Sequence, residues 1–188
     1  METFLVSTLV VAIGEIGDKT QLLALLLAAR FKRPVPIIAG ILVATTFNHT
    51  LAGLLGGWVR TAVDPALMRW ILGVSFLAIA AWALVPDKLE EKDAGTMGRF
   101  GVFAVTVVAF FLAEIGDKTQ LATVALAARF DNIVAVVAGT TTGMLIADVP
   151  AVLLGGSASR KLPMKAIRYV AAALFAALGI LILAGVSL

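Results

Sequence analysis

The sequence predicts an all-α integral membrane protein with six transmembrane helices, arranged as two inverted repeats of three helices each. Three observations support this fold class. The chain is 61% hydrophobic and only 14% charged, whereas a soluble domain usually contains about a quarter charged residues. Its apolar residues form long continuous runs without the alternation of a membrane β-strand, which favours helices over a barrel. The second half of the chain also repeats motifs of the first half.

The apolar runs define the expected spans. About 20 apolar residues are enough to cross a bilayer as a helix, and six runs in this chain are of that size. They cover most of the 188 residues, so no room remains for a soluble catalytic domain. The expected spans are Thr3 to Ala29, Pro34 to Trp58, Ala66 to Val85, Phe100 to Ala128, Ile133 to Gly155 and Ala166 to Val186.

An internal repeat divides the chain into two halves. An offset of 99 residues aligns EIGDKTQL at 15–22 with the same sequence at 114–121, and it also aligns shorter AARF, AG and LLGG matches. Because three spans are an odd number, the second half should enter the membrane from the opposite face, as in many secondary transporters. The expected units are a first three-helix repeat at 1–86, a linker at 87–99 and a second three-helix repeat at 100–188.

The basic residues between the spans predict the orientation, because cytoplasmic loops are enriched in Lys and Arg. The connections on one side contain ten such residues and those on the other side contain three, with the two motif lysines left out. The side with ten is expected to be cytoplasmic, which makes 87–99 a cytoplasmic linker and places both termini outside. The ten are Arg30, Lys32, Arg33, Lys88, Lys92, Arg99, Arg160, Lys161, Lys165 and Arg168, and the three are Arg60, Arg69 and Arg129.

The repeated motif places charges near the middle of the bilayer. Glu15 lies about twelve residues into its span, which corresponds to a depth of about 18 Å, and the second copy lies at a matching depth. On a continuous helix, Glu15, Asp18 and Lys19 share one face because they are three and four residues apart. A charge at this depth costs at least about 2.5 kcal/mol. We therefore expect the two polar patches to face each other across a wet cavity.

The charges of the motifs indicate the chemistry of that cavity. Two Glu and two Asp against two Lys leave a formal charge of minus two, which a divalent cation would neutralise and which protons could neutralise after the cation leaves. The glycine before each Asp allows either close helix approach or local unwinding. The chain has no cysteine, so oxygen ligands favour Ca²⁺, Mn²⁺ or Mg²⁺. Further neutral oxygens come from Thr20, Gln21, Thr119 and Gln120.

Other polar residues inside the spans are open to two interpretations. Asn48 and His49 lie in the second span, and Asp148 lies in the fifth span at the position equivalent to His49. These residues either line the ion path, with His49 or Asp148 handling protons, or they are structural, with Asn48 bonded to an adjacent helix and His49 neutral and capped. The motif residues Lys19 and Lys118 either pair structurally with the acids or act as counter-charges when the cation is absent.

The paired E-x-G-D-[KR]-[ST] signatures resemble the second family of calcium:cation antiporters, which includes bacterial MneA-type manganese exporters and Golgi manganese/calcium transporters. Both signatures are complete here as EIGDKT. The resemblance implies a manganese exporter of the bacterial inner membrane, without a cofactor, whose partners are membrane lipid, a divalent cation and protons rather than nucleic acid. A homo-oligomer stays open. By the same resemblance, the cation ligands are Glu15, Asp18, Glu114 and Asp117, supported by Thr20 and Thr119.

The favoured function is export of Mn²⁺, with Ca²⁺ as the alternative ion, from the cytoplasm in exchange for H⁺. Two other classes compete with it. A passive cation channel would use similar acids, but it typically needs a ring of them from several subunits. An intramembrane aspartyl protease would use Asp18 and Asp117 as its pair, but the G-x-G-D signature of that class has a glycine where this chain has Glu15.

Overall fold

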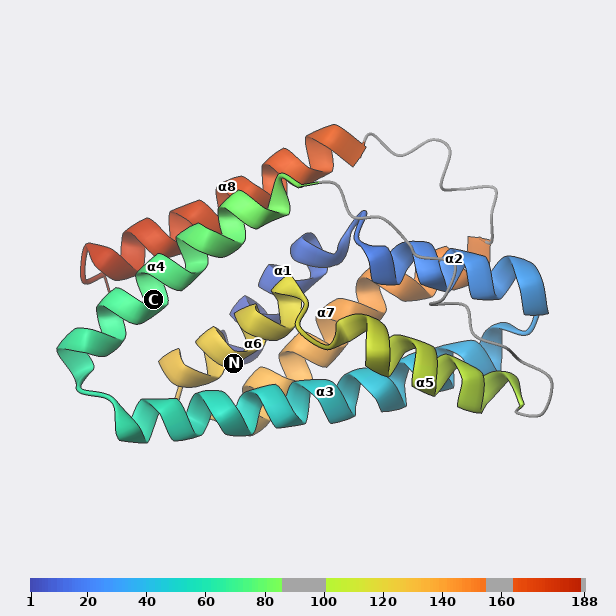
Figure 1. The fold of residues 1–188 in the computed structure, drawn as a ribbon, viewed down its shortest axis with the longest axis horizontal. Coiled ribbons are helices and arrows are strands. Elements are labelled where there is room, and N and C mark those ends of the chain that lie inside the picture. Colours follow the sequence, from blue (N-terminus) through green and yellow to red (C-terminus); the bar gives the residue numbers. More distant parts are fainter. Residues whose placement is uncertain (86–100, 155–163, 187–188) are drawn as a thin grey trace.

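The computed structural model describes residues 1–85, 101–154 and 164–186, and within these ranges it contains helices and short connections but no strand (Figure 1). The predicted linker at 87–99 lies outside the described residues. The helices are α1 Glu2–Glu15, α2 Lys19–Phe31, α3 Pro34–Ala62, α4 Pro65–Ala83, α5 Val102–Glu114, α6 Lys118–Arg129, α7 Ile133–Leu154 and α8 Met164–Leu183.

Several helix boundaries follow from local chemistry. Pro34 and Pro65 occupy the first turns of α3 and α4, where proline is favoured because that turn has no intrahelical partner for its N–H groups. The Asp64 side chain accepts a hydrogen bond from the backbone N–H of Ala66 at 2.9 Å and so caps α4. These two helix starts lie close to the predicted starts of the second and third spans. α3 is longer than expected, because it continues past Trp58 to Ala62.

The helices fit an integral membrane protein. Three of them, α3, α4 and α7, are long and apolar enough to cross a bilayer, while α5 and the segment Arg168–Leu183 are apolar but shorter. Large apolar side chains are exposed on the outer surface, including those of Phe47, Trp58 and Trp70. Lipid is the solvent that tolerates such exposure, because exposed apolar area of this extent is rare on soluble monomers.

The first and fourth predicted spans differ from expectation, because each is divided into two helices. α1 ends at Glu15 and α2 begins at Lys19; α5 ends at Glu114 and α6 begins at Lys118. Between them, Gly17 has a φ of 84° and Gly116 a φ of 73°, in the left-handed region that glycine adopts without steric cost. Of the two roles open to these glycines, local unwinding is the one found. The prediction that each motif lies on one continuous helical face is therefore wrong.

Replacing Gly116 with Ala is expected to lower the stability by about 1–2 kcal/mol, because an L-residue in the left-handed region costs that amount. A Cβ there would meet nothing within 4 Å, so the loss isolates the backbone effect. Thermal unfolding in detergent measures it. Gly101→Ala is the matched control, since its Cβ also meets nothing within 4 Å while its φ is −61°. Equal losses for the two variants would contradict this account of the break.

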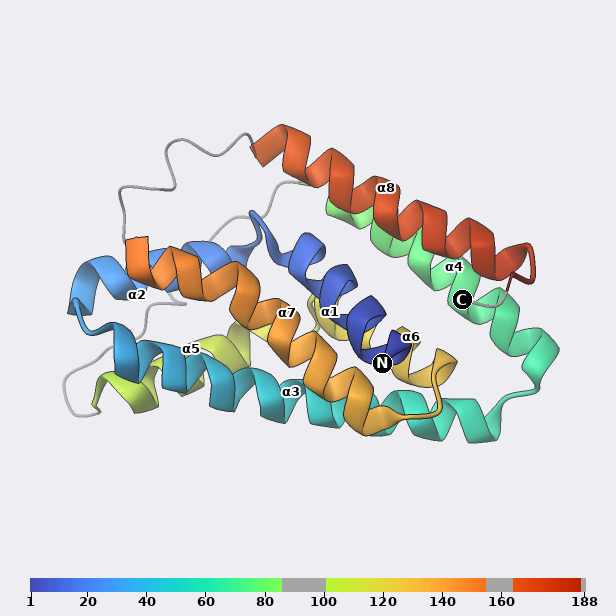
Figure 2. The same cartoon turned by 180° about the vertical axis from the view of Figure 1, so that it is seen from behind.

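The two halves are interlocked rather than packed side by side as separate bundles. α1 packs mainly against α7, and its equivalent α5 packs mainly against α3; α6 also packs on α3 and α2 on α7. Figures 1 and 2 show the broken pairs α1–α2 and α5–α6 in contact with the long helices of the other half. The motif acids Glu15, Asp18, Glu114 and Asp117 are thus buried where the two halves interlock.

Equivalent glycines allow this close interlocking in both halves. A Cβ on Gly40 of α3 would lie 2.6 Å from Cβ of Thr106, and a Cβ on Gly139 of α7 would lie 2.8 Å from Cβ of Ser7. Each distance is too short for a real side chain. Since Gly40 and Gly139, and Ser7 and Thr106, are pairs at the same offset of 99, the same helix contact is built twice.

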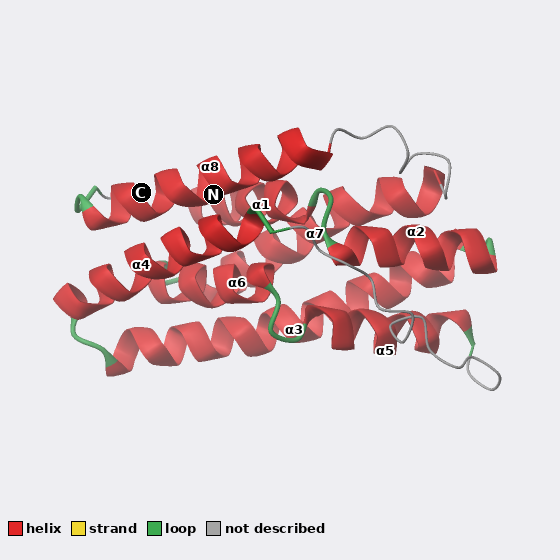
Figure 3. Ribbon diagram, turned by 45° about the horizontal axis from the view of Figure 1, so that its top comes forward, coloured by secondary structure: helices red, strands yellow, loops and turns green. Residues whose placement is uncertain are grey.

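Helices α4 and α8 lie side by side and form a layer over α1 and α6 (Figure 3). The rings of Phe76 and Phe175 stack between them at a centroid distance of 6.3 Å. These helices belong to one apolar cluster together with α6, and a second cluster joins α2, α3, α5 and α7. The broken segments therefore have apolar support on both sides, which holds the motif side chains in place.

Candidate cation site

The two helix breaks are built by the same hydrogen bonds. The backbone N–H of Gly17 donates to Oε1 of Gln21 at 2.8 Å, and the backbone N–H of Gly116 donates to Oε1 of Gln120 at 2.7 Å. The glutamine side chains therefore cap the breaks, and a role of their oxygens toward a cation stays a prediction. The Gln21 side-chain amide also donates to the carbonyl of Ala147 on α7 at 3.0 Å, which ties the first break to the other half.

Three motif carboxylates meet in one cluster. Glu15, Asp18 and Asp117 each place an oxygen such that the three atoms lie within 4.8 Å of one another. Two of these acids come from the first break and one from the second, so the cluster forms only where the two halves meet. All three side chains are at most 1% exposed. This arrangement can bind a metal ion, because hard divalent cations prefer several carboxylate oxygens.

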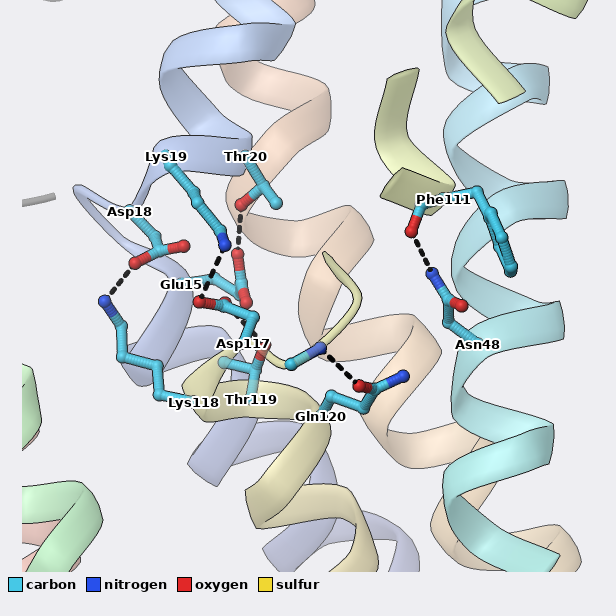
Figure 4. A network of polar contacts seen from close by, with 11 residues as sticks. Glu15, Asp18, Lys19, Thr20, Asn48, Phe111, Asp117, Lys118, Thr119 and Gln120 are labelled. Atoms are coloured by element: carbon cyan, nitrogen blue, oxygen red, sulfur yellow. Dashed lines mark hydrogen bonds and ion pairs between the residues drawn. The ribbon is translucent and has the colours of Figure 1, made fainter. Parts of the chain in front are cut away.

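The motif lysines cross between the halves. Nζ of Lys19 lies 3.3 Å from Oδ1 of Asp117, and Nζ of Lys118 contacts Oδ1 of Asp18 (Figure 4). Each lysine therefore pairs with the aspartate of the other motif. The Lys118 side chain is 5% exposed and that of Lys19 is 25% exposed. Pairing with the acids, one of the two roles left open above, is present in this conformation.

The motif threonines support the acids, as expected. The hydroxyl of Thr20 donates to Oε2 of Glu15, and the hydroxyl of Thr119 donates to Oδ2 of Asp117 at 3.3 Å. Both threonines are fully buried. A hydroxyl that donates to a carboxylate keeps its oxygen lone pairs, so each threonine can orient an acid and still offer an oxygen to a cation.

Glu114 is not a member of the three-carboxylate cluster and has different hydrogen-bond partners. Its Oε1 accepts a hydrogen bond from the hydroxyl of Thr45 at 2.6 Å, and its Oε2 accepts one from the amide of Asn48 at 2.9 Å. The Asn48 amide also donates to the carbonyl of Phe111 on α5 at 3.2 Å (Figure 4). The structural interpretation of Asn48, a bond to an adjacent helix, is thus confirmed. Thr45 was not predicted, since threonines in such helices commonly bond only to their own backbone.

Asp148 of α7 and His49 of α3 are both buried. Asp148 has no exposed surface, and it lies close enough to Glu15, Asp18 and Glu114 to repel their charges. Neither the carboxylate of Asp148 nor the ring nitrogens of His49 have a hydrogen-bond partner among the described residues. The interpretation of His49 as a capped histidine requires such a partner, and none is found among the described residues.

Solvent does not reach the acids in this conformation. Glu15, Asp18, Glu114 and Asp117 are each at most 1% exposed, so within the described part of the chain their side chains do not line an open cavity. The structure is thus closed around its carboxylates, and binding or release of an ion requires the helices to move.

Comparisons with known proteins identify the class of transporter. The chain matches the family described as "Divalent cation/proton antiporter GDT1" over residues 3–91 and 102–187. It is 49% identical to a Vibrio cholerae protein named "Putative manganese exporter" over 176 residues, which are 93% of this chain and 87% of that protein. A GDT1-like protein of Synechocystis is 29% identical over 194 residues, 93% of each chain. No solved structure matches the chain.

A plant relative extends the range of similar proteins. GDT1-like protein 1, chloroplastic, of Oryza sativa subsp. indica is 30% identical over 198 residues, which are 90% of this chain and 58% of that protein. The matches confirm the resemblance noted from the paired EIGDKT motifs, and they make the chain a cation transporter rather than an enzyme. The chain belongs to the divalent cation/proton antiporter GDT1 family.

Proposed function

We propose that the chain exports Mn²⁺ from the cytoplasm across the bacterial inner membrane in exchange for H⁺. The observation that carries this proposal is the buried cluster of Glu15, Asp18 and Asp117, in which acids of both halves lie within 4.8 Å of one another. A site assembled from both halves changes whenever the halves move relative to each other. That property is what an alternating-access transporter requires of its substrate site.

The proposed topology is six spans in two inverted repeats, with each broken pair, α1–α2 and α5–α6, counted as one span. The offset of 99 residues relates the breaks, the long helices and the glycine contacts of the two halves. The excess of Lys and Arg on one side supports a cytoplasmic location for residues 87–99 and an external location for both termini. Broken helices with a site at the break are a recurring feature of transporters of this architecture.

The crossed lysines explain how the site can exist without its cation. Lys19 and Lys118 pair with Asp117 and Asp18, so they can serve as counter-charges once a cation has left. An arriving divalent cation would take over these carboxylates and displace the ammonium groups. When the cation leaves, the lysines return, and protons can balance the remaining carboxylates, including Asp148. The exchange therefore needs only groups that the two motifs and α7 supply.

The choice of Mn²⁺ has two supports. Hydroxyl and carboxylate oxygens without any cysteine favour Mn²⁺, Ca²⁺ or Mg²⁺ over softer ions, and these are the donors in the cluster. The Vibrio cholerae relative that is 49% identical is named as a manganese exporter. Ca²⁺ is the second candidate ion, since the same carboxylates suit it.

Transport by purified protein in liposomes tests the proposal. An imposed pH gradient, acidic inside, should drive Mn²⁺ into the vesicles against its own gradient, and collapse of the pH gradient should stop uptake. Competition by Ca²⁺ and Mg²⁺, measured at two pH values, would rank the ions. Mn²⁺ flux that follows only its own gradient and is indifferent to pH would indicate a passive channel and contradict the exchange.

A further inference from the structure

The two motif glutamates have different surroundings although their motifs are identical. Both carboxylate oxygens of Glu114 accept hydrogen bonds from α3 of the other half, from Thr45 at 2.6 Å and from Asn48 at 2.9 Å. Glu15 accepts a hydrogen bond from Thr20 of its own motif and lies in the three-carboxylate cluster. Glu114 is not a member of that cluster.

The sequence of the long helices explains this difference. At the offset of 99, the residues of α7 equivalent to Thr45 and Asn48 are Met144 and Ala147. Neither has a side-chain hydrogen-bond donor, so α7 cannot hold Glu15 as α3 holds Glu114. The backbone carbonyl of Ala147 accepts from Gln21 instead. The difference between the surroundings of Glu15 and Glu114 therefore follows from the sequences of α3 and α7.

We infer that Thr45 and Asn48 are positioning residues that hold Glu114 outside the first coordination sphere of the cation in this closed conformation. Glu15, Asp18 and Asp117 then bind the metal, while Glu114 stays on α3. This inference rests on the proposed cation site and adds a division of roles within it. The two donors bond to different oxygens of Glu114. They resist rotation of its carboxylate, because that rotation would break both hydrogen bonds.

Asn48 also links this arrangement to the helix break. Its amide donates to the carbonyl of Phe111 in the last turn of α5 at 3.2 Å, where the final carbonyls of a helix have no intrahelical partner. The Asn48 side chain therefore binds both a carbonyl in the last turn of α5 and Glu114, the acid that ends this helix. The side chains of Asn48 and Thr45 are at most 1% exposed, so water does not compete for these bonds.

Direct cation binding tests the division of roles. Mn²⁺ binding to purified protein in detergent is measured by titration calorimetry for the wild type, Glu15→Gln and Glu114→Gln. Loss of an outer partner weakens metal binding by at most about 100-fold. Glu15→Gln removes a direct ligand, so it should weaken Mn²⁺ binding by more than that. Glu114→Gln removes at most an outer partner, so it should weaken binding by no more than about 100-fold. Equal losses would overturn the inference, and absence of wild-type Mn²⁺ binding would overturn the proposed function instead.

Release of Glu114 gives a second test that a merely structural role would not satisfy. In Thr45→Val and Asn48→Ala, the freed carboxylate can join the cluster; because affinity for such cations rises with the number of charged ligands, the KM for Mn²⁺ should fall by about tenfold while the maximal rate also falls. Adding Glu114→Gln should remove the gain in affinity, and Thr45→Ser should restore the wild-type values. A KM that rises, or that is unchanged by Glu114→Gln, would overturn the inference.

Thr140→Val is the matched control for these variants. Thr140 is a fully buried threonine of α7 whose hydroxyl donates to the backbone carbonyl of Val137 at 3.2 Å. It resembles Thr45 in burial but contacts no acid through that bond. Thr140→Val should leave both KM and the maximal rate near wild type. A change in KM equal to that of Thr45→Val would assign the effect to general helix packing and overturn the inference.

Discussion

Glu15→Gln and Asp117→Asn are each expected to abolish Mn²⁺ transport. Each change keeps the size of the side chain but removes a negative charge from the three-carboxylate cluster. A hard divalent cation needs that charge to replace its hydration shell. We expect the transport rate in liposomes to fall by more than about 100-fold, beyond the usual effect of an outer-sphere change. In cells, neither variant should protect against excess manganese.

The control for these variants is Glu2→Gln. Glu2 is an exposed acid in the first turn of α1, in the same half as Glu15 and far along the helix from it. Its neutralisation should leave transport unchanged, which separates a specific site from a general need for negative charge. Size-exclusion chromatography in detergent checks that each variant is folded. Full protection by both site variants would remove the cluster from the mechanism.

The motif and its internal offset could be read from the sequence, but the helix breaks could not be decided from it. EIGDKTQL contains a single glycine per copy, and one glycine inside a helical pattern costs only about 1 kcal/mol relative to alanine. A continuous helix with Glu15 and Lys19 on one face was therefore as consistent with the spacing as the break. Tertiary contacts decide the matter, since Gln21 caps the break and also bonds to α7.

The partners within the site were also beyond the sequence, for a different reason. The offset of 99 shows which residues are equivalent, but equivalence does not say that Lys19 pairs with Asp117 or that Lys118 pairs with Asp18. Those pairs depend on the interlocking of α1 with α7 and of α5 with α3. Thr45 had no signal at all, because its counterpart Met144 is apolar and the site was sought among residues that repeat.

Lys118→Met is expected to destabilise the protein by about 3–5 kcal/mol, the usual cost of removing one partner of a buried ion pair. Lys118 and Asp18 are 5% and 0% exposed in their side chains, so little solvent screens the remaining carboxylate. Lys19→Met should cost less, because the Lys19 side chain is 25% exposed. Denaturant unfolding in detergent micelles measures both. A smaller loss for Lys118→Met than for Lys19→Met would contradict the burial argument.

Two further measurements distinguish a structural role of Lys118 from a role as counter-charge. They are the stability of a double variant and the stabilisation of the protein by Mn²⁺. In Lys118→Met with Asp18→Asn, the carboxylate charge that Lys118 balanced is removed as well, so most of the stability should return while transport stays lost. In Lys118→Met alone, the cluster is more negative, so Mn²⁺ should bind this variant more tightly than the wild type. Mn²⁺ should therefore also raise the stability of the variant by a larger amount. For scale, a ligand at 100 times its Kd contributes about 2.7 kcal/mol. If Mn²⁺ stabilises both proteins equally, Lys118 is only a structural partner of Asp18. If Mn²⁺ stabilises Lys118→Met more than the wild type, the Lys118 ammonium and the metal compete for the same carboxylate, Asp18. That competition is what the counter-charge role of Lys118 requires.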